Sequence, residues 1–187
     1  MKSLDRVLQR WRIARAGRHI PRGSRVLDVG CFDGVLFDQL DGRVTSGVGI
    51  DPLLPTSLDH GHVRLIAGMF PDDIPPLDPF DVITMLAVVE HIAPERITNI
   101  ARACARLLKP GGLVVITVPS PRVDQILALL KFFRAIDGMS LEEHHGLEPS
   151  VIPSFFARAG FSLHTVEKFQ LGLNNLFVFQ RTELRDE

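Results

Sequence analysis

The ten residues from Arg25 to Gly34 constrain the fold of this chain more than any other segment. They read Arg-Val-Leu-Asp-Val-Gly-Cys-Phe-Asp-Gly, and an apolar stretch with helical spacing follows from Val35 to Leu40. The apolar residues suit a buried strand, and the glycines turn the chain before the helix begins. A strand that ends at glycine and leads directly into a helix brings backbone N–H groups close to a ligand. We therefore expect an α/β protein that holds a nucleotide-like molecule at this turn.

Asp28 is a charged residue within the apolar strand of this segment. Burying a carboxylate is costly unless another group pairs with it. Asp28 is therefore expected to have a partner in the folded protein.

Strand-like and helix-like segments alternate along the chain, which is typical of a mostly parallel sheet covered by helices. The 187 residues, 45% of them hydrophobic, suffice for a real core, and they contain no internal repeat or linker. We expect a single domain, residues 1–187, with an N-terminal helical region at 1–24. The expected strands are 25–29, 44–50, 62–67, 81–86, 113–118, 161–169 and 176–180. The expected helices are 3–19, 34–40, 94–108 and 150–159.

Residues 120–149 interrupt this alternation after the fifth strand. Asp124 to Ile136 is apolar with a helical period, and Glu142-Glu143-His144-His145-Gly146 then breaks the pattern. Ligands of doubly wound sheets bind outside the carboxyl ends of the strands, where an excursion after the fifth strand would lie. We interpret this segment as a lid or an acceptor-binding insertion.

Charge, cysteine content and hydropathy together favour a cytoplasmic protein that binds neither nucleic acid nor a membrane. The formal net charge is −1, so no overall field favours nucleic acid or an anionic membrane. The first 25 residues carry eight basic side chains and one acid, which we read as a solvated helix face. Cys31 and Cys104 form no disulfide framework or zinc spacing, which suits a reducing compartment. No apolar run is long enough for a membrane helix. We further expect a monomer or a homodimer.

Four blocks of the chain, in a fixed order, resemble one family. They are Val26–Gly34, Gly49–Asp51, Phe80–Ile83 together with Val89–Ile92, and Leu108–Gly112. Over about Val26 to Phe179 the chain resembles class I S-adenosylmethionine-dependent methyltransferases. The last two blocks are similar to the small-molecule branch, such as the O-methyltransferases of ubiquinone biosynthesis. The resemblance implies a three-layer Rossmann-like fold with a mostly parallel, seven-stranded sheet, in which one late strand is antiparallel.

The resemblance also implies S-adenosylmethionine as the cofactor and a set of residues around it. The first loop would wrap the methionine part, with Asp28 engaging the loop or the cationic groups of the cofactor. Asp51 follows Gly30 by 21 residues, where a carboxylate accepts both ribose hydroxyls. Gly68 and Met69 would lie beside the adenine ring. The expected cofactor-binding residues are Asp28, Gly30, Cys31, Phe32, Gly34, Asp51, Pro52, Gly68, Met69, Phe70, Leu86 and Ala87.

Two positions depart from the family pattern. Phe32 stands where the family usually has glycine, so its side chain either projects away from the pocket or narrows it. Met69 stands where the family commonly has an aspartate that meets the adenine amino group. Asp72 or Asp73 from the following loop is the candidate replacement.

The chemistry requires few acid–base groups, because S-adenosylmethionine is already a good methyl donor that needs mainly an aligned nucleophile. For a hydroxyl acceptor, His91, His144 and His145 are the candidate bases. The alternatives are structural: His91 fixes its loop, and His144 and His145 belong to a solvated turn. The cluster at 142–145 is also a possible divalent-metal site, but adjacent residues rarely supply a full coordination sphere, and we predict no metal.

The acceptor is narrowed by missing motifs. No Asn-Pro-Pro-Tyr or Asp-Pro-Pro-Tyr follows the fourth strand, and the chain has no tyrosine, so oxygen is favoured over nitrogen. The sequence thus favours in-line methyl transfer to a small molecule. Two alternatives stay open: an interaction subunit that binds the cofactor weakly or not at all, and an NAD(P)-binding oxidoreductase, against which the missing third glycine argues.

Overall fold

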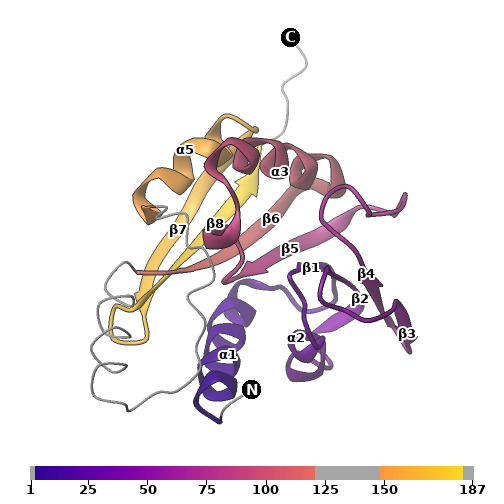
Figure 1. Ribbon diagram of the computed structural model, residues 1–187. Coiled ribbons are helices and arrows are strands. Elements are labelled where there is room, and N and C mark those ends of the chain that lie inside the picture. The colour runs from indigo at the N-terminus through magenta and orange to yellow at the C-terminus, as the bar shows by residue number, and fades with distance from the viewer. Residues whose placement is uncertain (1–2, 121–147, 183–187) are drawn as a thin grey trace.

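The computed structural model describes residues 3–120 and 148–182, and the strands in these ranges form one sheet (Figure 1). Its order is β3-β4-β2-β1-β5-β6-β8-β7. The strands are β1 Ser24–Val29, β2 Val44–Asp51, β3 Leu58–His60, β4 Val63–Ala67, β5 Phe80–Leu86, β6 Leu108–Pro119, β7 Phe161–Phe169 and β8 Asn174–Arg181. This mixed α/β sheet confirms the predicted fold class.

Strand direction explains why one edge of the sheet collects the predicted site residues. β4, β2, β1, β5 and β6 are parallel neighbours, so their carboxyl ends lie at the same edge. β8 pairs antiparallel with both β6 and β7, and it is the predicted late antiparallel strand. The loops that follow β1, β2, β4 and β5 therefore meet at one edge.

The predicted count of seven strands was one too few, because β3 is an additional edge strand antiparallel to β4. Its three side chains, Leu58, Asp59 and His60, are all exposed. A short strand without a buried face has no apolar alternation, so periodicity does not reveal it.

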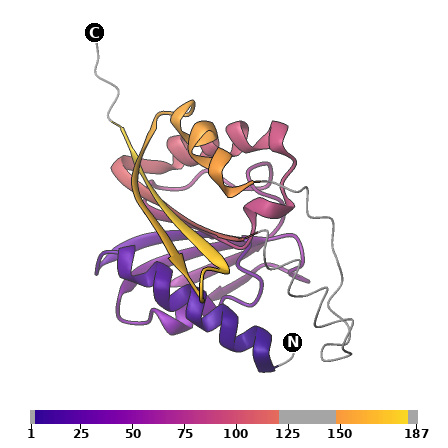
Figure 2. The ribbon, with the colours of Figure 1, turned by 90° about the vertical axis from the view of Figure 1, so that its left-hand side faces the viewer.

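Two hydrophobic clusters lie on opposite faces of the sheet and make three layers (Figure 2). On one face, called the α1 face here, α1 Ser3–Ala16 and α2 Val35–Gln39 bury Ile13 and Phe37. On the other, the α3 face, α3 Pro94–Leu107 and α5 Ile152–Ala157 bury Ile97 and Phe156. Side chains of a strand alternate between these two clusters, as the pleat requires.

Local sequence accounts for where the helices begin and end. α3 begins at Pro94, which suits a first helical position, and buries a stripe of apolar residues at helical spacing. The chain then leaves the helix at Leu107, and Leu108 already pairs with Phe80. The Lys109–Gly112 block therefore ends the helix as predicted, but it lies in an irregular start of β6 rather than in a separate loop.

The N-terminal helix is fixed to the sheet by polar contacts as well as by its apolar face. α1 continues into the turn η1 Gly17–His19, and the Arg43 guanidinium donates to the carbonyls of Gly17 and Ile20 at 3.0 and 2.8 Å. Arg15 and His19 both contact the Glu167 carboxylate of β7, at 2.5 and 3.3 Å. Part of the basic cluster, expected to be solvated, thus joins α1 to a distant strand.

The predicted insertion at 120–149 lies almost wholly outside the described residues, and so do the predicted helix at 124–136 and both His144 and His145. The predicted helix at 150–159 appears as the turn η3 Pro149–Val151 followed by α5. Within residues 3–120 and 148–182, no helix has the length and apolar character needed to cross a bilayer.

We predict that Phe156→Ala lowers the free energy of unfolding by about 3–5 kcal/mol, because the ring is fully buried. Its ring stacks on Phe179 with centroids 4.5 Å apart and meets the edge of Phe161 at 5.6 Å. Urea denaturation measures the loss. Phe155→Ala, at the half-buried neighbour on α5, is the matched control and should lose distinctly less; equal losses would contradict this account of the core.

Candidate functional site

The Asp51 carboxylate at the end of β2 holds the first loop in place. Its Oδ2 accepts a hydrogen bond from the Phe32 amide at 2.8 Å, and its Oδ1 accepts one from the Leu53 amide at 2.8 Å. The Gly30 amide donates to the Ile50 carbonyl at 2.8 Å, which fastens the same loop to β2 a second time. The structure thus brings together the two sequence blocks that were expected to bind one ligand.

Phe32 adopts a backbone conformation that normally requires glycine. Its φ is +47°, in the left-handed region where a Cβ is strained. This geometry explains why glycine was expected at the position. The side chain is 44% exposed, so the ring is not part of the core.

Gly30 brings the first loop against the segment that follows β5. With φ of +76°, a Cβ at this position would lie 2.4 Å from Cγ2 of Val88. Only glycine satisfies both the backbone angle and this contact. The first loop and the turn η2 Val89–His91 are therefore direct neighbours, although about 60 residues separate them in sequence.

Asp28 has the partner that its burial demands, and that partner is neutral. The Thr84 hydroxyl donates to Asp28 Oδ1 at 2.6 Å. Burial, opposed by the Thr84 hydrogen bond and reinforced by the charges of Asp51 and Asp33, raises the pKa of Asp28 to about 7. A cationic ligand group nearby would favour the ionised form, so this carboxyl suits a positively charged ligand.

The turn after β4 supplies the acid that Met69 lacks. Asp73 Oδ2 accepts a hydrogen bond from the Met69 amide at 2.7 Å, and a Cβ on Gly68 would lie 2.6 Å from the Asp73 Cβ. Asp72 instead contacts Arg96 at 3.5 Å. Of the two candidate replacements, the structure brings Asp73 to the turn.

The remaining predicted residues divide between the edge and the core. Leu86 is the last residue of β5, and Ala87 follows it with φ of +60°. The Ala87 amide donates to the Thr117 carbonyl at 2.9 Å. The side chains of Cys31 and Phe70 are buried, so at most their backbones face a ligand. Gly34 and Pro52 lie in the turns after β1 and β2.

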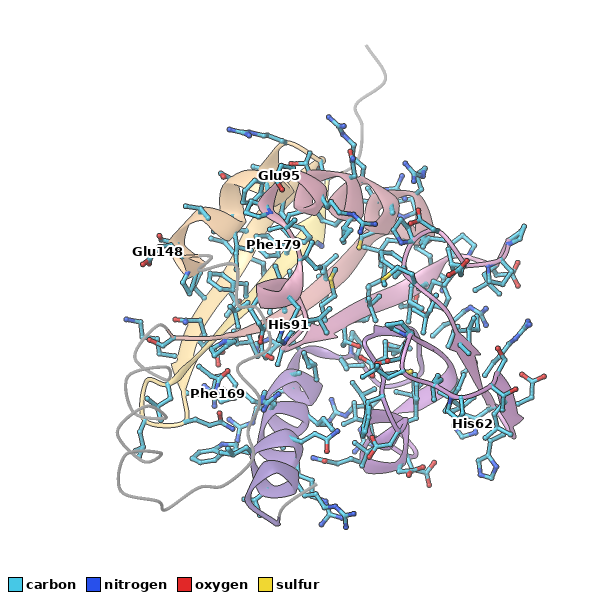
Figure 3. The ribbon with its side chains drawn as sticks, viewed as in Figure 1. His62, His91, Glu95, Glu148, Phe169 and Phe179 are labelled. Atoms are coloured by element: carbon cyan, nitrogen blue, oxygen red, sulfur yellow. The ribbon has the colours of Figure 1, made fainter. Side chains whose placement is uncertain are left out.

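His91 lies in the turn after β5 with an exposed side chain (Figure 3). His62, by contrast, lies in the turn between β3 and β4, the two strands at one lateral edge of the sheet. A cavity of about 300 Å³ borders His62, and its lining also includes Phe37, Asp38, Asp41 and His60. This cavity is remote from the carboxyl edge, and the described part of the chain contains no cluster of metal-ligating side chains there or elsewhere.

Glu90, which lies beside His91 in η2, belongs to the Val89–Ile92 block, but the sequence analysis gave it no role in the site. Its side chain is buried, and burial raises the pKa of Glu90 to about 7, while the positive charge of Arg12 lowers it. The available signal was an acid directly after an apolar run, Met85 to Val89. The Arg12 charge that acts on it comes from α1, about 80 residues earlier in the chain.

A protein-family model described as a methyltransferase domain matches residues 2–166 of the chain. The ubiquinone biosynthesis O-methyltransferase of Pseudomonas entomophila (strain L48) is 34% identical over 103 residues, covering 49% of this chain and 43% of that protein. The protein of the same name from Pseudomonas aeruginosa (strain LESB58) is 33% identical over 118 residues, covering 57% and 48%. The chain thus spans less than half the length of these relatives.

Solved structures share the fold at low sequence identity. The N-methyltransferase NodS from Bradyrhizobium japonicum WM9, in complex with S-adenosyl-L-homocysteine, has a TM-score of 0.66 at 13% identity, covering 94% of this chain and 86% of that chain. The Burkholderia thailandensis 1,6-didemethyltoxoflavin-N1-methyltransferase has a TM-score of 0.67 at 16% identity, covering 92% and 77%.

We predict that Phe32→Gly is more stable than Phe32→Ala by about 1 kcal/mol. Both variants remove the ring, but only glycine relieves the left-handed backbone angle. Thermal or urea unfolding of the two variants measures the difference. Equal stabilities would mean that the backbone at this position is not strained.

We predict that the free energy of unfolding falls between pH 5 and pH 8, in part because of Asp28. The folded state keeps this proton up to about pH 7, whereas the pKa of an aspartate exposed to water is 3.8. The stabilisation is therefore present below pH 3.8 and is lost as pH rises through 7. Asp28→Asn should remove roughly 3 kcal/mol of this fall, measured by urea denaturation at both pH values. A parallel pH dependence in variant and parent would refute this.

Proposed function

The chain belongs to the methyltransferase domain family, and from this premise we propose that it transfers a methyl group from S-adenosylmethionine to an oxygen atom of a small molecule. S-adenosylmethionine is the cofactor that this membership brings with it. The arrangement that carries the proposal is the Asp51 carboxylate, which fastens the first loop to the end of β2.

The residues at the edge fit the parts of this cofactor. Asp51 uses one lone pair of each carboxylate oxygen for a backbone amide, which leaves the others for two ribose hydroxyls. Asp28 is a buried carboxyl with a neutral partner, so it gains a counter-charge beside a cationic methionine group. Asp73, at the Gly68–Met69 turn, takes the place of the acid that would accept from the adenine amino group.

When bound, S-adenosylmethionine supplies an electrophilic methyl group on a positively charged sulfur. The protein then has to hold the acceptor oxygen in line behind that carbon and keep water away. The exposed His91, in the turn after β5, is the candidate base that takes the acceptor's proton. An oxygen acceptor is supported by the names of the sequence relatives, both O-methyltransferases, and by the absence of the tyrosine motif that is associated with nitrogen.

Calorimetric titration with S-adenosylhomocysteine and with NADH tests the cofactor assignment. The protein should bind the first and not the second, and Asp51→Ala should weaken binding by about 10- to 100-fold, because hydrogen bonds to a charged group are lost. Asp59→Ala, at an exposed carboxylate of β3, is the control and should bind like the parent. Circular dichroism spectra of both variants serve as the control for correct folding.

Failure to bind S-adenosylhomocysteine, with Asp51→Ala indistinguishable from the parent, would overturn the proposal in favour of an interaction subunit. The acceptor is found by incubating the protein and labelled S-adenosylmethionine with fractions of a cell extract. Label should enter small molecules as an ether or ester; label in an amine would refute the oxygen assignment.

A further inference from the structure

Three buried side chains at the carboxyl edge carry an oxygen without a hydrogen-bond partner among the described residues. They are Glu90 Oε2, Thr117 Oγ1 and Asn174 Oδ1, in residues that are 6%, 0% and 8% exposed. Each unsatisfied buried polar group costs about 1–3 kcal/mol. Native proteins rarely retain such groups without a function, and three at one edge indicate a place that a ligand completes.

Thr117 and Asn174 lie on the same face of the sheet. Thr117 follows Val115 by two residues on β6, and Asn174 precedes Leu176 by two on β8; both apolar residues belong to the cluster on the α1 face. Because side chains two apart in a strand share a face, Thr117 and Asn174 also point to the α1 side. The pairing of Thr117 with Leu176 places them diagonally across neighbouring strands.

Glu90 belongs to the same region through two contacts of its neighbours. The Ala87 amide donates to the Thr117 carbonyl, which joins the segment after β5 to the end of β6. Val88 packs against Gly30 of the first loop, so the turn that carries Glu90 touches the cofactor loop. The positive charge of Arg12, on α1, acts on the Glu90 carboxyl, which therefore lies toward α1.

The N-terminal helix is held above this region by Gln170. Its amide nitrogen donates to the Leu8 carbonyl of α1 at 3.1 Å, and its amide oxygen accepts from Asn174. Asn174 is thereby oriented by a residue that also positions α1. The three unsatisfied oxygens thus lie between α1, the ends of β5 and β6, and the start of β8.

We propose that Glu90, Thr117 and Asn174 bind the acceptor, forming the polar floor of its pocket beneath α1 and beside the cofactor loop. The Glu90 and Asn174 oxygens accept hydrogen bonds, and the Thr117 hydroxyl both accepts and donates, so the acceptor presents O–H or N–H donors to the first two, beyond the group that is methylated. This assignment rests on the proposed methyl transfer. His91, exposed on the same turn, remains the candidate base, and Glu90 acts as a binding residue.

Glu90→Gln and Thr117→Val test the proposal, because each preserves side-chain shape: the first replaces one carboxylate oxygen by an NH2 donor, and the second removes the hydroxyl. The probe is the acceptor-active fraction of the cell extract, diluted in series with labelled S-adenosylmethionine. Each variant should raise the apparent KM for that fraction at least tenfold and leave the KM for S-adenosylmethionine unchanged. Glu95→Gln, at an exposed glutamate on α3 (Figure 3), is the control and should behave like the parent.

Stability provides a second measurement that does not depend on the acceptor. If the unsatisfied oxygens serve a ligand, both substitutions should leave the Tm of the free protein unchanged or raise it. A lowered Tm together with unaltered KM would mean that these groups are structural, and would overturn the inference. Affinity for S-adenosylhomocysteine separates the two proposals. A parent protein that does not bind it contradicts the proposed methyl transfer itself. If binding is retained and the KM for the acceptor fraction is unaltered in both variants, only the assignment of Glu90, Thr117 and Asn174 to the acceptor pocket is contradicted.

Discussion

The hydrogen bonds of the Asp51 carboxylate are the constraint on which the site depends. Asp51 ends β2, and its two oxygens receive the amide of Phe32 from the first loop and that of Leu53 from its own turn. The loop after β1 contains Gly30, Phe32 and Gly34 at φ of +76°, +47° and +73°, and Phe32, the one with a Cβ, is the residue whose amide Asp51 accepts. One carboxylate thus joins the loop after β1 to the turn after β2.

Much of this arrangement was predictable from sequence, because it depends on local patterns. The segment from Arg25 to Gly34 predicted β1 and its turn, Pro94 predicted the start of α3, and the four blocks predicted a family that the match over residues 2–166 confirms. What sequence did not reveal depends on tertiary contacts. β3 has no buried face, and the choice between Asp72 and Asp73, both candidates from sequence, depends on the turn that brings Asp73 to the Met69 amide.

Two buried carboxyls at the carboxyl edge have little to compensate their burial. Within residues 3–120 and 148–182, the Thr84 hydroxyl donates to Asp28, and Glu90 Oε2 has no hydrogen-bond partner. In both, burial raises the pKa to about 7, which is the energetic signature of a carboxyl in a poorly solvating place. Asp81 shows the opposite: Lys109 and the Arg25 amide hold its pKa below the usual value at the other edge of the sheet. The two carboxyls with raised pKa values lie at the carboxyl edge, next to the well-paired Asp51, whereas Asp81 lies at the start of β5.

The hydrogen bond between Gln170 and Leu8 joins residues 162 positions apart. Contacts of such long range form late in folding, because the intervening chain must first be ordered. On a ribosome, α1 would emerge first but could not take its final place until the β7–β8 hairpin had been synthesised and paired. The nascent chain could then assemble its cofactor loops, all within the first half of the sequence, well before α1 closes over the edge of the sheet.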